Sequence, residues 1–542
     1  MDQDPRRQAE GVSSVHQPHS RDEIGRSPAA PAPSRRQLFR AVGVLAAVGA
    51  GTGLVEAVES APAEAAAGGG PLLAIDPDLH LLRRATYGPT PASLAELKRL
   101  GRQNWLDQQL NPGTIDDTAC HQLVNKRFPR LLWSIDHARR HYAPDITYDM
   151  MRWLGGATVT RAVWSKRQLF EVMVEFWSNH LNITNFSGPT WNTRHDYDRV
   201  VIRQHALGRF EDMLWASANH PAMMAYLNND ESTKVEPNEN YGRELLELHT
   251  VGVDGGYTEA DMHQSALIMT GFGIDPATDG FQYTAGNHYV GPVSVMGFSD
   301  PNGNADGHAV GQAYLSYLAN HRSTAVHIAT KLCLRFVSDT PSVTLVNQLA
   351  DVYQNNQTDV VPVLQALFDS AEFAGSVGKK VRRPYEDLVA ATRILGYQPD
   401  KAGNEGLMDL YWVANAMGQL PLAWPQPNGY PDEAVAWQSA SGTLQRWNTH
   451  RALASHWWPH KLRRPNPRTW LPKRLPRTHG AVIDALAKRM VFRTLTPAHR
   501  GAILEFLGHR AGDPVSRSSG IVNDRLPHVV ALILDAPYHA LR

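Results

Sequence analysis

Apolar residues recur at helical spacing along most of this chain, and no long stretch alternates between apolar and polar residues as a half-buried strand would. Glycine and proline interrupt the pattern and divide it into separate helices. The 542 residues are 42% hydrophobic, which is enough for a large core. The predicted fold is therefore mainly α: a multi-helix globular domain with long Gly/Pro-rich loops and little β structure. Helical stretches are expected at 102–110, 148–180, 196–218, 239–251, 259–271, 308–320, 323–337, 341–354, 358–371, 384–396, 405–417, 435–457, 480–491, 497–508 and 523–537.

Residues 1–65 are predicted to be a disordered leader followed by a twin-arginine signal peptide. The leader is polar, and the pair Arg35-Arg36 precedes an uncharged run of 15 residues, Ala41 to Val55. Small residues suited to signal peptidase follow at 60–65. A membrane span needs roughly 17–25 residues, so we expect no transmembrane helix in the mature form. The predicted location is secreted, periplasmic or cell-surface. The alternative is a basic patch beside a short buried helix.

The remaining chain is expected to contain a main domain, a linker and a C-terminal segment. Residues 72–460 are predicted to form the main helical domain, in which 272–307 is a long loop with a short hairpin because it is rich in Gly, Asn, Asp and Tyr. Residues 461–478 are basic and proline-rich, which favours a surface linker over a docking site for an anionic polymer. Residues 479–542 are expected to be a helical segment that packs on the main domain.

The charge balance and the cysteine count exclude several classes of protein. The chain has 53 basic and 53 acidic residues, so it lacks the positive field of a nucleic-acid or anionic-membrane binder. Its two cysteines cannot build a disulfide scaffold or a Cys-rich zinc site. Cys120 and Cys333 could pair after export, but the helical surroundings of Cys333 favour a buried free thiol.

The first candidate site lies near the end of the expected helix 148–180. At about 100° per residue, Glu171, Glu175 and Asn179 fall on one polar stripe. His180 falls on an apolar flank beside them. The alternative for the two glutamates is a solvated helix face, and the alternative for His180 is a buried imidazole that bonds a backbone carbonyl.

The second candidate site is the expected helix 239–251. Asn240, Glu244 and Glu247 align on one face, while Arg243 lies four residues before Glu247, at the spacing of an ordinary ion pair. His249 lies about 140° around the helix from Glu244, so these two cannot chelate one ion from an unbroken helix.

These acidic residues suggest an acid/base pair drawn from two helices. Glu175 and Glu244 are the predicted catalytic pair, with Glu171 and Glu247 in support. Two carboxylates held close together cannot both ionise easily, so one keeps its proton near neutral pH. Hydrolysis of a glycoside or an ester requires such a pair.

The substrate-binding residues are expected to include aromatic side chains from a third segment, 418–431. Its prolines stiffen the backbone, and its flat rings can stack on a sugar, although a rigid loop packed on helices is the alternative. The predicted substrate-binding residues are Asn179, His180, Asn240, Arg243, His249, Trp424 and Tyr430.

A divalent metal is the competing cofactor hypothesis. The nearest template is the Glu-x-x-His pattern of carboxylate-bridged di-iron bundles, but Glu247 occupies the position of its histidine. The candidate ligands are Glu175, His180, Glu244, Glu247 and His249. The sequence contains no Walker phosphate loop, Gly-x-Ser-x-Gly elbow or His-Glu-x-x-His motif, and no glycine-rich turn that follows a strand.

Together with the early His80–Thr90 block, these segments resemble a bacterial family, domain of unknown function 1800, over roughly residues 74–542. Tyr430 stands where the family usually has Trp, and the loop around His288 lacks the family's His-Asp pair. The matching motifs are Phe176-Trp177-Ser178-Asn179-His180, Asn240-Tyr241-Gly242-Arg243-Glu244-Leu245-Leu246-Glu247-Leu248-His249-Thr250-Val251-Gly252, Tyr257-Thr258-Glu259-Ala260-Asp261, Thr270-Gly271-Phe272 and the Gln419–Tyr430 block.

The resemblance implies an exported, helix-rich protein and supplies no reaction. Such proteins are often encoded beside an exported protein that is similar to phosphatases and sulfatases. This association suggests that the two are companions and that they act on a cell-surface or environmental polymer. We therefore expect an extracytoplasmic hydrolase of a carbohydrate or another cell-surface or environmental polymer. The alternatives are a carboxylate/histidine metal protein with a redox role, and a non-catalytic surface partner of the phosphatase-like companion.

Overall fold

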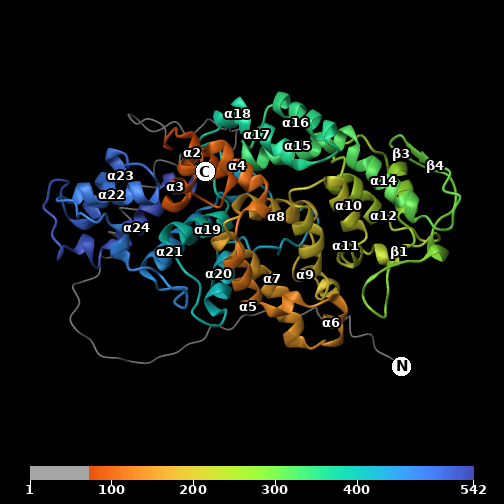
Figure 1. The fold of residues 1–542 in the computed structure, drawn as a ribbon, viewed down its shortest axis with the longest axis horizontal. Helices are drawn as coiled ribbons and strands as arrows, with labels where there is room; N and C mark the ends of the chain where they lie inside the picture. The colour runs from red at the N-terminus through yellow and green to blue at the C-terminus, as the bar shows by residue number, and fades with distance from the viewer. Residues whose placement is uncertain (1–71) are drawn as a thin grey trace.

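The structure is a computed structural model that describes residues 72–542, and it confirms a mainly α fold (Figure 1). The predicted leader and signal peptide lie outside the described residues. Cys120 and Cys333 are both buried and free.

The helices and strands follow one another in this order. The first part contains α2 (Pro77–Ala85), α3 (Pro91–Leu100), α4 (Arg102–Leu110), α5 (Thr118–Arg127), α6 (Ile135–Arg140), α7 (Pro144–Trp164), α8 (Gln168–His180), α9 (Arg194–Tyr197), the π-helix η5 (Asp198–Arg203), α10 (Phe210–Ala218) and α11 (Pro221–Leu227). The middle contains α12 (Glu239–Glu244), the π-helix η7 (Leu245–His249), α13 (Glu259–Ile268), β1 (Phe272–Ile274), β2 (Phe281–Tyr283), β3 (Val293–Val295), β4 (Phe298–Asp300), α14 (His308–Asn320), α15 (Arg322–Phe336), α16 (Val343–Asn355), α17 (Val360–Asp369) and α18 (Ala371–Ala374). The last part contains α19 (Pro384–Leu395), α20 (Glu405–Ala416), α21 (Ala440–Ser455), α22 (His479–Met490), α23 (Pro497–Leu507), α24 (Leu526–Leu534) and α25 (Pro537–Ala540).

The described chain is elongated, with its long helices gathered around the centre (Figure 1). Helices α10, α12 and α14 and the two hairpins occupy one end, and α22, α23 and α24 occupy the other. Helices α7, α8, α19 and α20 lie between them, and α15 to α17 run along one side.

Helix α8 buries almost its whole circumference, as expected for a helix that is largely apolar. Val172, Met173 and Trp177 are each at most 1% exposed. The indole Nε1 of Trp177 donates to the carbonyl oxygen of Ala206 at 3.0 Å, and its ring stacks on Phe210 with 5.5 Å between ring centroids. These contacts fix the rotation of α8 and therefore the directions of its polar side chains.

The stretch 148–180, predicted as one helix, is two helices with a break at 165–167. The carboxylate of Asp117 stabilises this break by accepting from the Ser165 hydroxyl at 2.8 Å and from the Lys166 amide at 2.7 Å. The amide of Arg167 donates to the Ser165 hydroxyl at 3.0 Å. Helix α7 therefore ends at a position where the sequence has no glycine or proline to indicate a helix C-terminus.

The predicted loop 272–307 contains two short antiparallel hairpins instead of one. Strand β1 pairs with β2, and β3 pairs with β4. His288 lies between the hairpins, where its Nε2 and the Asn302 side-chain oxygen are 2.9 Å apart. The imidazole therefore has a structural partner within the loop.

The C-terminal segment packs on the helices that precede it. Helix α24 lies against α21 and α22. The chain between α21 and α22 also contacts the main domain, because Arg463 and Gln398 exchange backbone hydrogen bonds and the Trp470 Nε1 donates to the Leu395 carbonyl at 3.1 Å. The basic, proline-rich stretch 461–478 is thus tied to the end of α19.

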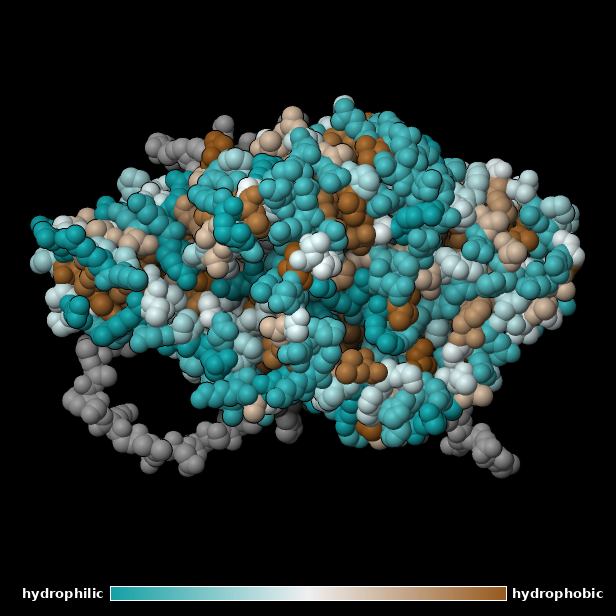
Figure 2. Space-filling model, viewed as in Figure 1, coloured by the Kyte–Doolittle hydropathy of each residue, from teal (hydrophilic) through white to brown (hydrophobic). Residues whose placement is uncertain are grey.

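The surface is largely hydrophilic on the face shown in Figure 2, and its apolar side chains form small scattered groups. Within residues 72–542, no helix is both long enough and apolar enough to cross a membrane.

Candidate functional site

The two glutamates of α8 are buried and paired with arginines. Glu171 is 6% exposed and accepts two hydrogen bonds from Arg203 of η5, at 2.7 and 2.9 Å. Glu175 is 7% exposed and accepts from Arg383 Nη2 at 2.7 and 2.8 Å and from Arg335 Nη2 at 3.0 Å. Neither side chain lies on a solvated face, which was the alternative considered for both.

The arginines around Glu175 continue into a larger group of buried charges. Glu386, in the first turn of α19, accepts from Arg335, from Arg542 at 2.7 Å and from the backbone amide of Arg383 at 2.9 Å. Burial raises the pKa of the Glu386 carboxyl, but the three guanidinium groups outweigh it and hold that pKa well below its usual range.

Asp432 completes this group, which we call the buried ion network. Its carboxylate lies 3.3 Å from Arg335 Nη1 and 3.4 Å from Arg383 Nη1. The network consists of Glu175, Arg335, Arg383, Glu386, Asp432 and Arg542. It joins α8, α15, α19, the loop after α20 and the end of the chain, so Glu175 has a structural role that the sequence did not show.

Helices α8, η7 and α15 meet at His180. The Nε2 of His180 lies 3.1 Å from the His249 carbonyl and must donate to it, which leaves Nδ1 to accept from Lys331 at 3.0 Å. His180 is thus a buried histidine that bonds a backbone carbonyl, the alternative considered for it. Burial lowers the pKa of Lys331 to about 8 and that of His249 to about 3.

Glu244 and Glu247 lie outside the buried ion network and are both half-buried. They occupy the junction of α12 and η7, three residues apart. Burial and the nearby charge of Glu247 raise the pKa of Glu244. Burial and the nearby charge of Glu247 raise the pKa of Tyr257. Glu244 therefore feels the charge of Glu247, whereas Glu175 is paired with arginines.

The aromatic loop 418–434 lies beside these glutamates. Tyr226 connects the two. Its hydroxyl donates to the Pro425 carbonyl at 2.8 Å. Burial is the main cause that raises the pKa of Tyr226, and the charge of Glu244 raises it further. Trp424 precedes Pro425, is half-buried, and packs on Tyr430 with ring centroids 4.9 Å apart. Tyr226 thus links the aromatic loop to the surroundings of Glu244.

The end of α8 holds the aromatic loop by its backbone. The Asn182 side chain donates to the carbonyls of Trp424 at 3.0 Å and of Gln426 at 2.6 Å. The Asn179 side-chain oxygen accepts from the Tyr430 amide at 3.2 Å. Asn179 and Asn182 therefore position the loop and are not free to bind a ligand through those atoms.

Gly429 allows the loop to lie directly on α8, and its replacement tests this contact. Its φ is +70°, and an added Cβ would lie 2.0 Å from the Asn179 carbonyl oxygen. We expect Gly429→Ala to lower the free energy of unfolding by about 1–3 kcal/mol more than Gly418→Ala does. Gly418 is the matched control, because its φ is +89° and its added Cβ would have open space. Equal losses in urea unfolding would show that the contact is unimportant.

The other predicted residues lie apart from the ion network. Asn240 and Arg243 are exposed, and the Arg243 Nε contacts the Met262 sulfur at 3.4 Å. Among the candidate metal ligands, Glu175 and His180 are occupied by the hydrogen bonds above, and the His249 Nε2 is buried without a partner in the described chain. The sequence analysis missed Arg335, Arg383 and Lys331, although a charged residue within the apolar helix 323–337 is a signal that could have indicated burial.

Comparison with known proteins identifies the family. A family model described as "Protein of unknown function (DUF1800)" matches residues 80–541. The chain belongs to this family. No curated protein and no solved structure matches this DUF1800 protein. Its function must therefore be argued from its own residues.

Proposed function

We propose that this DUF1800 protein is an exported enzyme that hydrolyses a carbohydrate or another cell-surface or environmental polymer, with Glu244 and Glu247 as its acid/base pair. The observation that carries the proposal is the position of these two carboxylates, half-buried and beside the aromatic loop. Glu171 and Glu175 are poor candidates, because their carboxylate oxygens already accept hydrogen bonds from Arg203 and from Arg383 and Arg335.

The two glutamates differ in a way that suits different roles. Burial and Glu247 favour the protonated form of Glu244, which a general acid requires. Glu244 would give its proton to the leaving oxygen as the bond to that oxygen breaks. Glu247, whose charge is close enough to raise the pKa of Tyr257, would take a proton from the attacking water. One proton is given and one is taken, so each turnover consumes one water.

The surroundings of the pair suit an extended substrate. Trp424 offers a partly exposed flat ring next to the loop backbone that Tyr226 binds. Sugar rings bind to such faces through their apolar C–H surfaces. Both glutamates are partly exposed, so a chain too long for a closed cavity can reach them.

A panel of cell-wall and environmental polysaccharides tests the proposal through the release of new reducing ends. We expect the wild-type protein and the control variant Glu259→Gln, altered at an exposed residue in the first turn of α13, to cleave at least one polymer. The double variant Glu244→Gln/Glu247→Gln should not cleave it. Cleavage by the double variant at the wild-type rate contradicts the assignment, and no cleavage of any polymer favours a non-catalytic surface partner.

A further inference from the structure

A second cluster of ionisable side chains lies away from the proposed site, where the C-terminal segment packs on α19 and α21. Asp387 of α19, His450 of α21 and His539 of α25 place ligand atoms within 4.8 Å of one another. They are 1%, 2% and 5% exposed, respectively. Buried side chains of these types, converging from three helices, are the usual components of a metal site.

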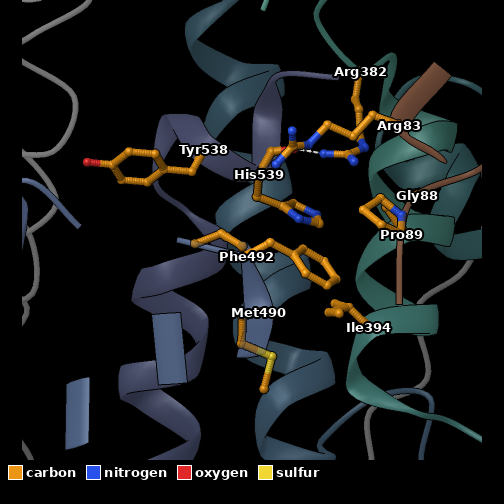
Figure 3. A pocket seen from close by; sticks show the side chains of 11 residues that line it. Arg83, Gly88, Pro89, Arg382, Ile394, Met490, Phe492, Tyr538 and His539 are labelled. Carbon is orange, nitrogen blue, oxygen red and sulfur yellow. Dashed lines mark hydrogen bonds between the residues drawn. The ribbon is translucent and has the colours of Figure 1, made fainter. Parts of the chain in front are cut away.

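Two of the atoms in this cluster lack a hydrogen bond. The Nε2 of His539 lies 3.2 Å from Asp387 Oδ1, yet neither atom has a hydrogen-bond partner within the described residues. The two atoms face each other only as an ion pair, without the geometry of a hydrogen bond, and burying polar atoms without hydrogen bonds is unfavourable. Figure 3 shows the imidazole of His539 between the guanidinium groups of Arg83 and Arg382 on one side and Phe492 on the other. The ring is therefore held in the interior and cannot turn to solvent.

The spacing of the atoms fits a tetrahedral ion. Two ligand atoms bound to zinc at 2.0–2.1 Å lie about 3.3 Å apart at the tetrahedral angle. Asp387 Oδ2 lies 3.0 Å from His450 Nε2, and Asp387 Oδ1 lies 3.2 Å from His539 Nε2. Each histidine therefore lies at this spacing from one oxygen of Asp387, and all three ligand atoms lie within 4.8 Å of one another.

A further carboxylate orients one of the histidines. The Nδ1 of His450 lies 2.9 Å from Asp535 Oδ1. A proton on Nδ1 that is donated to Asp535 directs the lone pair of Nε2 toward Asp387 and His539. This carboxylate–histidine arrangement accompanies most metal-binding histidines. Asp387 and Asp535 together carry two negative charges, which offset the charge of a divalent cation.

We propose that Asp387, His450 and His539 bind a divalent transition-metal ion of the zinc class and that Asp535 positions His450. A cavity of about 10 Å³ borders His539, which is room for about one water beside this histidine. The ion would link α19 and α21 to α25, near the end of the described chain. The proposal is independent of the proposed polymer hydrolysis, because the two sites share no residue.

Zinc titration of the purified, chelator-treated protein tests the proposal. We expect one equivalent of zinc to bind, and its binding to raise the Tm by roughly 2 °C or more. We also expect one equivalent of Co²⁺ to give the visible absorption typical of a four-coordinate site. Less than about a tenth of an equivalent of zinc bound to the wild type would overturn the proposal. The cluster would then be a hydrogen-bonded group centred on His450.

Variants locate the ion. His539→Ala should weaken zinc binding by about 100-fold or more, and Asp535→Asn by about 10–100-fold, because Asp535 acts through His450. His499→Ala is the matched control, since this buried histidine lies 2.8 Å from the Tyr538 hydroxyl and outside the cluster. Asp535→Asn keeps the shape of the side chain, so it remains informative if His539→Ala fails to fold. Equal zinc affinity in Asp535→Asn and the wild type would contradict the assignment.

Discussion

Arg383→Met is expected to lower the free energy of unfolding by about 3–5 kcal/mol, because the substitution removes a cation that neutralises buried carboxylates. Arg383 is 1% exposed and contacts the carboxylates of Glu175, Glu386 and Asp432. Without it, Glu175 keeps only Arg335 as a charged partner at 3.0 Å. The carboxylate charge that Arg383 no longer compensates remains buried, and burying an uncompensated charge destabilises the folded state.

Urea unfolding followed by circular dichroism measures this loss. The control is Arg451→Met on α21, where the arginine is exposed and the change should stay within about 0.5 kcal/mol. If Arg383→Met unfolds at the same urea concentration as the wild type, the buried ion network does not hold α8, α15 and α19 together.

Glu244→Gln is expected to reduce kcat/KM by about 10²–10⁴-fold on the polymer that the panel identifies. Glutamine cannot give a proton to the leaving oxygen, although it fills the same space. The general acid works only while protonated, so activity falls as the pH rises through the pKa of Glu244. Because burial and Glu247 raise this pKa, the alkaline limb of the pH profile should lie above the usual range of a glutamate.

Two comparisons separate this role from a structural one. An activated aryl leaving group needs less protonation, so Glu244→Gln should lose much less activity on an aryl glycoside than on the polymer. Glu175→Gln should instead lower stability, because it removes the charge that faces Arg383 and Arg335. If Glu244→Gln retains polymer activity within about threefold of the wild type, Glu244 is not the acid.

Much of the fold could be predicted, because it depends on short-range pattern. Helical periodicity predicted most of the long helices, and Asn238 caps the start of α12 through its side chain, as capping rules require. The break between α7 and α8 could not be predicted. It depends on the carboxylate of Asp117, which lies 48 residues before Ser165 in the sequence.

The candidate site was less predictable, because its partners come from distant segments. Spacing placed Glu171 and Glu175 on one stripe, but only packing shows that Arg203 binds the first and Arg383 the second. The aromatic loop was predicted as a segment, whereas its position against α8 depends on contacts of Asn179 and Asn182. Contacts between residues as far apart as 175 and 383 leave no periodic signal in a single sequence.

A crystal structure of Glu244→Gln bound to an oligomer of the polymer substrate tests the central claim most directly. The account predicts a sugar ring stacked on Trp424 and the scissile oxygen within hydrogen-bonding distance of the residue 244 side chain, with Glu247 facing the attacked carbon. An oligomer bound elsewhere, with residues 244 and 247 both out of its reach, would contradict the account.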